Sequence, residues 1–460
     1  MQQPDLMDKI VSLCKRRGFV FPGSEIYGGL ANSWDYGPLG VELKNNIKQL
    51  WWKRFVQQRD DVVGLDAALI MNPKVWEASG HVATFSDPLV EDTKTHERFR
   101  LDHLLEDAGV NPAGMDLQQM WQAAQDKALK SPSGNALSEP KRFNLMFKTY
   151  IGPAEEQTNV AYFRPETAQA MFVQFKNVLD TARKRLPFGI AQQGKAFRNE
   201  ITPGNFIFRT REFEQMEIEY FIPVPNTDAD WSEYFESWRQ AMINWMQNDL
   251  GLDMAHIHEL EVPKEDLAHY SKRTIDFEYE FPFGKKELYG LAYRTDFDLS
   301  NHEKASGQEL KYTDPETGEK TVPHVIEPTW GVDRTILAVL SEHYREDGEG
   351  DKKRVWLQLP PKLAPYKVAV FPLLKNKPEL VEKARGIYNV LKEQYMVAWD
   401  DRGNVGKRYY SQDEIGTPFC ITVDFDTLEN GTVTVRDRNT AEQVRISVAE
   451  LEAYLKSKIV

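Results

Sequence analysis

The chain has 460 residues, of which 41% are hydrophobic and 12% aromatic, enough apolar material for the cores of two or three domains. Its 57 Lys and Arg residues against 70 Asp and Glu residues give a net charge of −13, which excludes binding of nucleic acid through bulk positive charge but not an enzyme with local basic patches. It has no apolar run of about 18 residues and no apolar N-terminal segment of signal-peptide length, so we expect no membrane association. Two cysteines, Cys14 and Cys420, cannot build a disulfide framework or a cysteine-rich zinc site, so we expect a cytoplasmic protein in a reducing compartment.

The first strong pattern along the chain is helical and covers residues 38–59. Apolar side chains recur there at spacings of three and four, at Leu43, Ile47, Leu50, Trp51 and Phe55. Pro38 suits the first turn of a helix, where its missing N–H is not needed. The short apolar run GLDAALIM at residues 64–71 predicts a buried strand that ends at Pro73.

Two segments of different character follow. Residues 101–160 mix short helical pieces with Pro, Gly and Ser, which predicts an inserted subdomain. Residues 206–224 are rich in β-favouring side chains and predict a strand paired in a hairpin across the TPGN turn. Every second side chain of such a strand shares one face, here Arg209, Arg211, Phe213, Gln215, Glu217 and Glu219. This face is too charged for a core, so it meets water or lines a polar site.

The last third of the chain predicts a second domain. Residues 346–353 (EDGEGDKK) predict a solvated loop, and the prolines of residues 357–366 predict a semi-rigid linker. From residue 367 the pattern is strand, helix, strand, strand and helix, which is typical of a separate α/β domain over residues 367–460. Residues 1–356, with the insertion, would form the main domain.

Two short motifs are misleading. Residues 189–195 fit G-x-x-x-x-G-K, but no Ser or Thr follows for Mg²⁺ and the continuation AFRNE predicts a strand, so a phosphate-binding loop is disfavoured. His256 and His258 lie two apart without a third ligand pattern nearby, and surface positions explain them better than a metal site.

Three other segments are chemically suggestive. Arg198 and Glu200 lie two apart, so they point the same way and could hold a phosphate and a base amino group; the alternative is a salt-bridge ladder on an exposed sheet. Gly331 allows close approach of the backbone, and Arg334 stands at the start of a predicted helix. The third segment is Arg164-Pro-Glu166-Thr-Ala-Gln.

Together these segments resemble the class II aminoacyl-tRNA synthetases. FRNE followed by FRTREFEQME resembles their motif 2, GVDR opening a helix resembles motif 3, and the helix from Pro38 with its following strand resembles motif 1. The set FPGSEIYGG, WDYGPLG, NPKVWEASGH, RPETAQ, TPGNFIFRTREFEQME, RTDFDL, GKRY and QDEIGTP is similar to the homodimeric glycyl-tRNA synthetases over nearly the whole chain. The resemblance implies an α+β fold, with an antiparallel sheet flanked by helices, a helical insertion and a C-terminal α/β anticodon-binding domain.

The resemblance also implies an activity. Glycine would be activated with ATP and Mg²⁺ to glycyl-adenylate and transferred to the 3′-terminal adenosine of tRNA(Gly) by a homodimer. The first step needs neutralised phosphates and fixed geometry more than a side-chain nucleophile. Aromatic residues Trp51, Trp52 and Phe55 on one helix exceed what the subunit itself would need, which also predicts a dimer. Two alternatives stay open: a non-catalytic nucleic-acid-binding subunit, and a ligase that loads glycine onto another acceptor.

Roles for individual residues are implied by the resemblance alone. Arg198 would hold the α-phosphate and the glycine carboxylate, Arg334 the γ-phosphate, Glu200 the adenine edge and Phe213 its ring, with Glu287 a Mg²⁺ ligand. The implied ATP contacts are Arg198, Asn199, Glu200, Phe208, Arg209, Thr210, Arg211, Glu212, Phe213, Glu287, Leu288, Gly331, Val332, Asp333 and Arg334. The implied glycine contacts are Arg100, Glu166, Phe213, Glu214, Gln215, Met216, Glu217, Glu327, Pro328, Thr329, Trp330 and Gly331. Among these, Glu166, Glu217 and Glu327 would surround the ammonium group.

The chain departs from the family pattern at three places. Thr329 stands where close relatives usually carry Ser, and its methyl group either limits the side-chain space beside glycine or packs into the core. Tyr410 and Ser411 replace two basic residues of many relatives, which weakens the expected anticodon contacts. Residues 93–97 (TKTHE) lack the cysteine zinc ligands of some relatives, so we predict no zinc.

Overall fold

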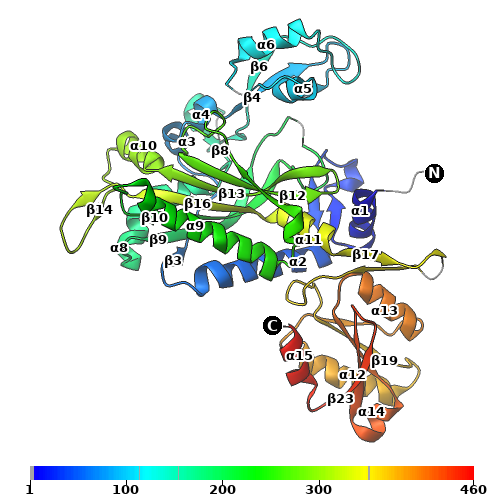
Figure 1. Ribbon diagram of the computed structural model, residues 1–460. Helices are drawn as coiled ribbons and strands as arrows, with labels where there is room; N and C mark the ends of the chain where they lie inside the picture. Colours follow the sequence, from blue (N-terminus) through cyan, green and yellow to red (C-terminus); the bar gives the residue numbers. More distant parts are fainter. Residues whose placement is uncertain (1–4, 113, 154, 202, 351–352, 460) are drawn as a thin grey trace.

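The computed structural model describes residues 5–459 apart from 113, 154, 202, 351 and 352 (Figure 1). Its centre is a seven-stranded sheet in which neighbouring strands are antiparallel, except that the last two are parallel. In spatial order the strands are β11 (Ile257–Glu261), β12 (Arg273–Phe281), β13 (Gly284–Thr295), β16 (His324–Gly331), β10 (Glu212–Ile222), β9 (Phe188–Phe197) and β3 (Val62–Gly64). The implied antiparallel sheet flanked by helices is therefore confirmed.

Helices cover the two faces of this sheet differently. Met216, Ile218 and Tyr220 of β10 share a large apolar core with α2 (Pro38–Trp52), α9 (Asp228–Asn244) and α11 (Val332–His343). On the opposite face Phe221 packs in a second cluster with α7 (Ala168–Val173), α8 (Phe175–Ala182) and α10 (Phe297–Ser306). Because side chains alternate along a strand, Glu217 and Glu219 lie on this second face, next to its apolar cluster.

The helix predicted over residues 38–59 is confirmed as α2 and a following π-helical turn, Lys53–Gln57. The aromatic side chains of this helix are buried within the subunit itself. Trp51 and Phe55 are 0% and 1% exposed, and their ring centroids lie 5.4 and 4.8 Å from that of Trp330 in the subunit's own core. The inference of a dimer from these aromatic residues is therefore wrong, although a dimer itself is not thereby excluded.

Two predicted strands are shorter than expected. Residues 65–71 form no strand beyond an isolated bridge between Ile70 and Phe163, and they are exposed or half-buried instead of buried as predicted. The side chain of Arg164 donates to the carbonyl of Ala67 and its backbone N–H to the carbonyl of Leu69. The strand expected from residue 206 begins at Glu212. Phe206 has a φ of 58° and packs its ring against Trp34, and this distant contact outweighs the local β-propensity of residues 206–211. Arg209 and Arg211 accordingly lie outside β10, and Thr202 of the predicted turn is outside the described residues.

A small unit of residues 86–144 projects from one end of the molecule (Figure 1). It consists of β4 (Ser86–Glu91), β5 (Arg98–Arg100), β6 (Lys141–Asn144), α5 (Leu101–Asp107) and α6 (Leu117–Asp126), with its own apolar cluster. It begins before the predicted insertion of residues 101–160. Its loops are tied by the carboxylate of Asp92, which accepts hydrogen bonds from the backbone N–H of Lys94 and Thr95 and from the side chains of Ser131 and Asn135.

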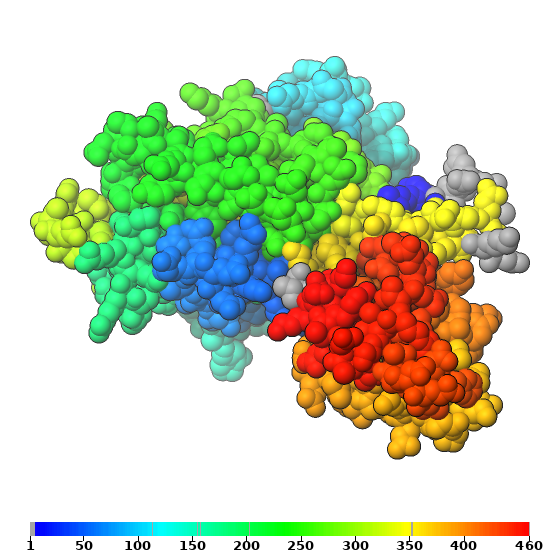
Figure 2. Space-filling view, turned by 60° about the horizontal axis from the view of Figure 1, so that its bottom comes forward, coloured from blue at the N-terminus to red at the C-terminus, as the bar shows by residue number. Residues whose placement is uncertain are grey.

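The C-terminal unit, residues 367–459, forms a separate lobe (Figure 2). Its five-stranded sheet has the order β20 (Val397–Trp399), β19 (Val368–Pro372), β21 (Phe419–Val423), β22 (Thr432–Asp437) and β23 (Gln443–Ser447). Its helices are α12 (Pro378–Leu391), α13 (Val405–Glu414), α14 (Phe425–Asn430) and α15 (Leu451–Ile459). The strands and helices predicted for this part of the chain are confirmed, and their apolar faces form a core of their own.

A buried ionic cluster, here called the joint, connects the two lobes. Asp413 of α13 accepts hydrogen bonds from Arg436 of β22 at 2.8 and 3.0 Å and from Arg354 of the main lobe at 2.9 Å. The predicted linker is itself held, because Leu359 and Leu363 are buried in the main core. The residue types alone predicted a semi-rigid linker. The packing of its leucines makes this segment part of the main lobe.

The other elements are short. They are α1 (Leu6–Arg17), β1 (Val20–Pro22), β2 (Trp34–Tyr36), α3 (Pro73–Ala78), α4 (His81–Thr84), β7 (Lys148–Tyr150), β8 (Val160–Tyr162), β14 (Tyr312–Thr313), β15 (Lys320–Thr321), β17 (Tyr344–Asp347) and β18 (Arg354–Leu357). The loop predicted at residues 346–353 joins β17 to β18, although Asp351 and Lys352 are outside the described residues. Among the described helices, none is long and apolar enough to cross a membrane.

Candidate functional site

A cavity of about 380 Å³ opens on the face of the sheet that carries Glu217. Most of the residues implied by the resemblance line it: Glu166, Arg198, Glu200, Phe208, Arg209, Thr210, Phe213, Glu214, Gln215, Glu217, Glu287, Leu288, Glu327, Thr329, Gly331, Asp333 and Arg334. They come from the loop before α7, from β10, β13 and β16, from the start of α11 and from the long loop between β9 and β10. Segments far apart in the sequence thus meet in one polar space.

Two arginines supply positive charge to this cavity. The Nε of Arg198 donates to the carbonyl of Pro165 at 3.1 Å, and its guanidinium lies 5.3 Å from the ring centroid of Phe213. Arg334 lies 4.5 Å from the ring of Phe208 and donates to the carboxylate and the carbonyl of Glu287, both at 3.0 Å. Aromatic faces and fixed acceptors hold both guanidinium groups in place, which suits the binding of phosphate oxygens.

Carboxylates stand beside these arginines. The Arg334 guanidinium lowers the pKa of Glu287, so this group is ionised. On the neighbouring strand, burial, reinforced by Glu287 and Glu278, raises the pKa of Asp276 to about 7. Paired carboxylate oxygens of this kind fit Mg²⁺, which prefers hard oxygen ligands. Asp276 was not among the residues implied by the resemblance. The register of β12 with β13 places it opposite Gly290, close to Glu287.

Glu200 is a buried carboxylate that pairs loosely with Arg209 and has an oxygen free to accept a hydrogen bond. One of its carboxylate oxygens, Oε2, makes no hydrogen bond to the described residues, although Arg209 lies 3.7 Å away. A buried carboxylate oxygen left unsatisfied is costly and indicates that a donor is supplied from outside the chain.

The other end of the cavity is acidic. Glu166, Glu217 and Glu327, here called the carboxylate pocket, come from the loop before α7, from β10 and from β16. The hydroxyl groups of Thr329 and Thr167 both donate to Glu217, the first at 2.9 Å. Arg294 of β13 is buried beside them and donates to Glu327 and, through two nitrogens, to Asp298 of α10.

This pocket holds more negative than positive charge. Burial raises the pKa of Glu327 to about 8, against the opposing effect of Arg294. Burial and the nearby Glu166 also raise the pKa of Glu217. Although burial opposes it, the imidazole of His81, 3.2 Å away, lowers the pKa of Glu166 below its usual value. Such perturbed carboxyl groups in a cavity are typical of a site for a cation.

Some implied contacts point elsewhere. Glu214 borders the cavity, but its carboxylate pairs with Lys44 and Lys48 of α2. The side chains of Met216, Pro328, Trp330 and Val332 are buried outside the cavity lining. Arg211 donates to the carbonyl of Ala31, Glu212 pairs with Lys195, and Asn199 lines a neighbouring groove. Arg100 pairs with Asp87 at 3.3 Å and with Asp102, in the small projecting unit.

Arg294 and Glu219 were missed, although both had a signal in the sequence. Arg294 opens the segment RTDFD, whose Arg and Asp at a spacing of four form the buried pair seen here. Glu219 continues the alternation of the charged face of β10 and is fully buried behind the cavity. Alternation placed Glu219 on the polar face of β10, and the spacing paired Arg294 with Asp298, but neither pattern showed that these side chains are buried beside the cavity.

The two disfavoured motifs have structural explanations. Residues 189–195 lie within β9, where a Cβ on Gly194 would come within 2.1 Å of Arg164 Nη2. Arg164 donates to the carbonyl of Lys195 at 2.7 Å, so the glycine makes room for an arginine and not for a phosphate. His256 and His258 pair separately with Glu342 and Glu280, at 2.9 and 2.6 Å.

Comparison with known proteins agrees with this arrangement. Residues 147–343 match the class II tRNA synthetase core domain (G, H, P, S and T), and residues 367–458 match an anticodon binding domain. The chain is 52% identical to a glycine–tRNA ligase of Caldanaerobacter subterraneus subsp. tengcongensis and 53% identical to one of Alkaliphilus oremlandii, each over 98% of both chains. It is 51% identical to a glycine–tRNA ligase of Clostridium acetobutylicum over 100% of both chains.

Proposed function

The chain belongs to the class II glycine–tRNA ligases, and we propose that glycine is activated in the cavity between Arg198, Arg334 and the carboxylate pocket. The enzyme joins glycine to tRNA(Gly) with ATP, through glycyl-adenylate. A single observation supports the proposed location: one cavity carries fixed guanidinium groups at one end and buried carboxylates at the other. The phosphates of ATP require positive charge at one end of the cavity, and the ammonium group of glycine requires negative charge at the other.

ATP is proposed to lie at the arginine end. Arg334 and Arg198 would bind its phosphates, and the unsatisfied oxygen of Glu200 would accept the adenine amino group. Phe213 lines the same cavity and would stack on the adenine ring. Glu287 and Asp276 would hold Mg²⁺, which would neutralise phosphate charge when bound.

Glycine is proposed to lie at the acidic end. Its ammonium group would be held by Glu166, Glu217 and Glu327, and its carboxylate would point toward Arg198. This carboxylate attacks the α-phosphorus of ATP, a bond forms between them, and pyrophosphate leaves. Arg198 would stabilise the charge that develops on the α-phosphate in this step. The terminal adenosine hydroxyl of the tRNA then attacks the carbonyl of the adenylate and AMP leaves.

We also propose which part of the chain carries which function. Residues 1–356 would carry the catalytic domain, residues 357–366 the connection and residues 367–460 the domain that binds the anticodon. The match over residues 367–458 supports this division. Ser411 accepts two hydrogen bonds from Arg17, so this position connects the C-terminal lobe to the main lobe.

Glycine-dependent exchange of pyrophosphate into ATP tests the site. We expect Arg198→Ala to lower the exchange rate about a hundred- to thousandfold, because Arg198 contacts charge that develops in the transition state. The melting temperature should stay unchanged, and the exposed Arg142→Ala serves as the matched control. Exchange within about threefold of the wild type would contradict the assignment. Charging of total tRNA by the wild type distinguishes tRNA from another acceptor.

We further propose that the enzyme is a homodimer, on a surface other than the one first expected. Ile26, Tyr27 and Leu30 are 89%, 87% and 66% exposed, an unusual concentration of apolar side chains in one loop. Leu30 also lines a groove of about 960 Å³ with Phe147 and Phe163. Light scattering should give a dimer mass for the wild type and a monomer mass for the double variant Ile26→Asp, Tyr27→Asp. A wild-type monomer at micromolar concentration would contradict the proposal.

A further inference from the structure

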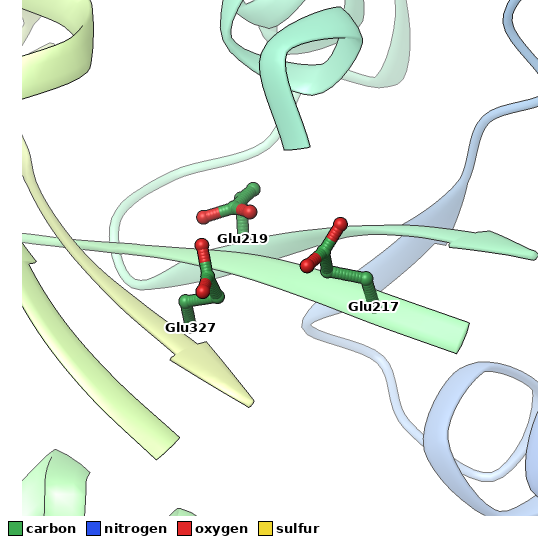
Figure 3. A group of neighbouring side chains, drawn as sticks. All are labelled: Glu217, Glu219 and Glu327. Atoms are coloured by element: carbon green, nitrogen blue, oxygen red, sulfur yellow. The ribbon is translucent and has the colours of Figure 1, made fainter. Parts of the chain in front are cut away.

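Glu219 is a buried carboxyl group that the proposed reaction does not use. It is 0% exposed and does not line the cavity, and neither of its carboxyl oxygens has a hydrogen-bond partner among the described residues. Oxygens of Glu219, Glu217 and Glu327 lie within 4.8 Å of one another. Figure 3 shows the three carboxyl groups turned toward one another from β10 and β16. An unpartnered group of this kind needs a physical explanation.

The strand register makes Glu219 and Glu327 neighbours. The pairing of Glu217 with Thr329 and of Tyr220 with Ile326 places Glu219 directly opposite Glu327 on the adjacent strand. Two like charges in this relation destabilise a sheet, and more so when both are buried. One of the two carboxyl groups must therefore hold a proton.

The surroundings decide which of the two keeps its proton when glycine is bound. Arg294 donates to Glu327, whereas Glu219 receives no such bond. Beyond this pair, Glu217, Glu166 and Asp298 add negative charge, and His302 of α10 is turned to Gln169 instead of to the cluster. Burial, reinforced by Glu327, raises the pKa of Glu219 well above its usual value.

We propose that Glu219 is a positioning residue that works as a neutral carboxylic acid and donates a hydrogen bond to Glu327 when glycine is bound. One side-chain rotation, or one bridging water, closes the distance between the two groups. Glu327 is then held toward the ammonium group by Arg294 on one side and by Glu219 on the other. The proton stays on Glu219, so the pocket gains a donor without a further negative charge. This inference rests on the proposed function of the carboxylate pocket.

Two variants of the full-length enzyme test the role of the proton. Glu219→Gln keeps a neutral donor of the same size, and we expect its glycine KM in pyrophosphate exchange to stay within about threefold of the wild type. Glu219→Leu removes the donor, and we expect its glycine KM to rise about tenfold or more, with the ATP KM unchanged. Glu233→Gln on the exposed side of α9 is the matched control. Melting temperatures show whether each variant folds.

Infrared difference spectroscopy reads the protonation state directly. The spectrum of the glycine-bound wild type minus that of glycine-bound Glu219→Gln should show the carbonyl band of a protonated carboxylic acid. A missing band in the wild type, or a Glu219→Gln variant as impaired for glycine as Glu219→Leu, would show that Glu219 acts as a charge and would overturn the proposal. So would a wild-type glycine KM in folded Glu219→Leu, or stabilisation of the wild type by Ca²⁺ that Glu219→Gln abolishes, since the cluster would then be a cation site. Failure of glycine-dependent exchange in the wild type would instead contradict the proposed function.

Discussion

The joint and the carboxylate pocket are both buried ionic clusters, but their charges are balanced differently. In the joint, one carboxylate, Asp413, is bound through both oxygens by two arginines, and all contacts lie within the chain. Beside the pocket, a single arginine, Arg294, donates to Glu327 and to Asp298, and the neighbouring Glu219 has no hydrogen-bond partner among the described residues. A cluster whose charges are balanced within the protein stabilises its structure. A cluster with more carboxyl groups than arginines is balanced by protons and by a cation from outside, and the glycine ammonium group is the proposed cation.

The largest effect is expected at the joint. Asp413→Asn leaves Arg354 and Arg436 buried without their counter-charge, which should lower the free energy of unfolding of the C-terminal lobe by about 3–5 kcal/mol. Urea unfolding measures this change, with Asp426→Asn at an exposed position of the same lobe as control. The glycine KM should not change. A normal stability with an altered glycine KM would mean that the joint and the pocket do not differ as described.

The pocket should respond to pH. In the free protein Glu327 holds a proton below its pKa of about 8, whereas the bound ammonium group requires the carboxylate. Glycine binding therefore releases up to one proton, and the affinity should rise with pH, at most about tenfold per unit, and level off above pH 8. Calorimetry in two buffers of different ionisation enthalpy counts the protons. A glycine affinity that is constant from pH 6 to 8 would contradict the assignment of Glu327.

The smallest effect is expected at Thr329, whose hydroxyl donates to Glu217. Thr329→Ser keeps this donor and removes a methyl group, so we expect the kcat/KM for glycine to stay within about twofold. If the methyl group faces the α-carbon of glycine, the kcat/KM for alanine should rise severalfold, because overlap in a rigid pocket is costly. Pyrophosphate exchange with both amino acids gives the ratio. An unchanged ratio would show that the methyl group packs into the core.

Local patterns predicted the parts of this fold in which one periodicity dominates. The helix from Pro38, the strand from Glu212 and the helix after Gly331 all follow their apolar spacing. Residues 206–211 could not be predicted in this way, because Phe206 packs against Trp34, far away in the sequence. The same is true of residues 65–71, whose carbonyls are bound by Arg164.

The site was predictable in kind but not in detail. The resemblance carried by its motifs implied many of the residues that line the cavity, and alternation placed Glu217 and Glu219 on one face. Alternation also places Glu214 on the other face of the strand, against its implied contact with glycine, but it could not show that Lys44 and Lys48 are its partners there. Nor could it show that Arg294 is the buried counter-charge, because β13 reaches the pocket only through the order of strands in the sheet.

Gly194 shows how a sterically required residue can imitate a ligand-binding motif. The space that its missing side chain leaves is filled by the guanidinium of Arg164, which crosses β9 and binds the carbonyls of Lys195 and Ala67. It stands five residues after Gly189 and just before a lysine, so it forms part of a nucleotide-loop signature by coincidence, although the Ser or Thr that would complete the signature is absent. The likeness to a nucleotide-binding loop therefore has a cause unrelated to nucleotide binding. The glycine at position 194 is explained by the space that the Arg164 side chain needs, and not by the binding of a phosphate.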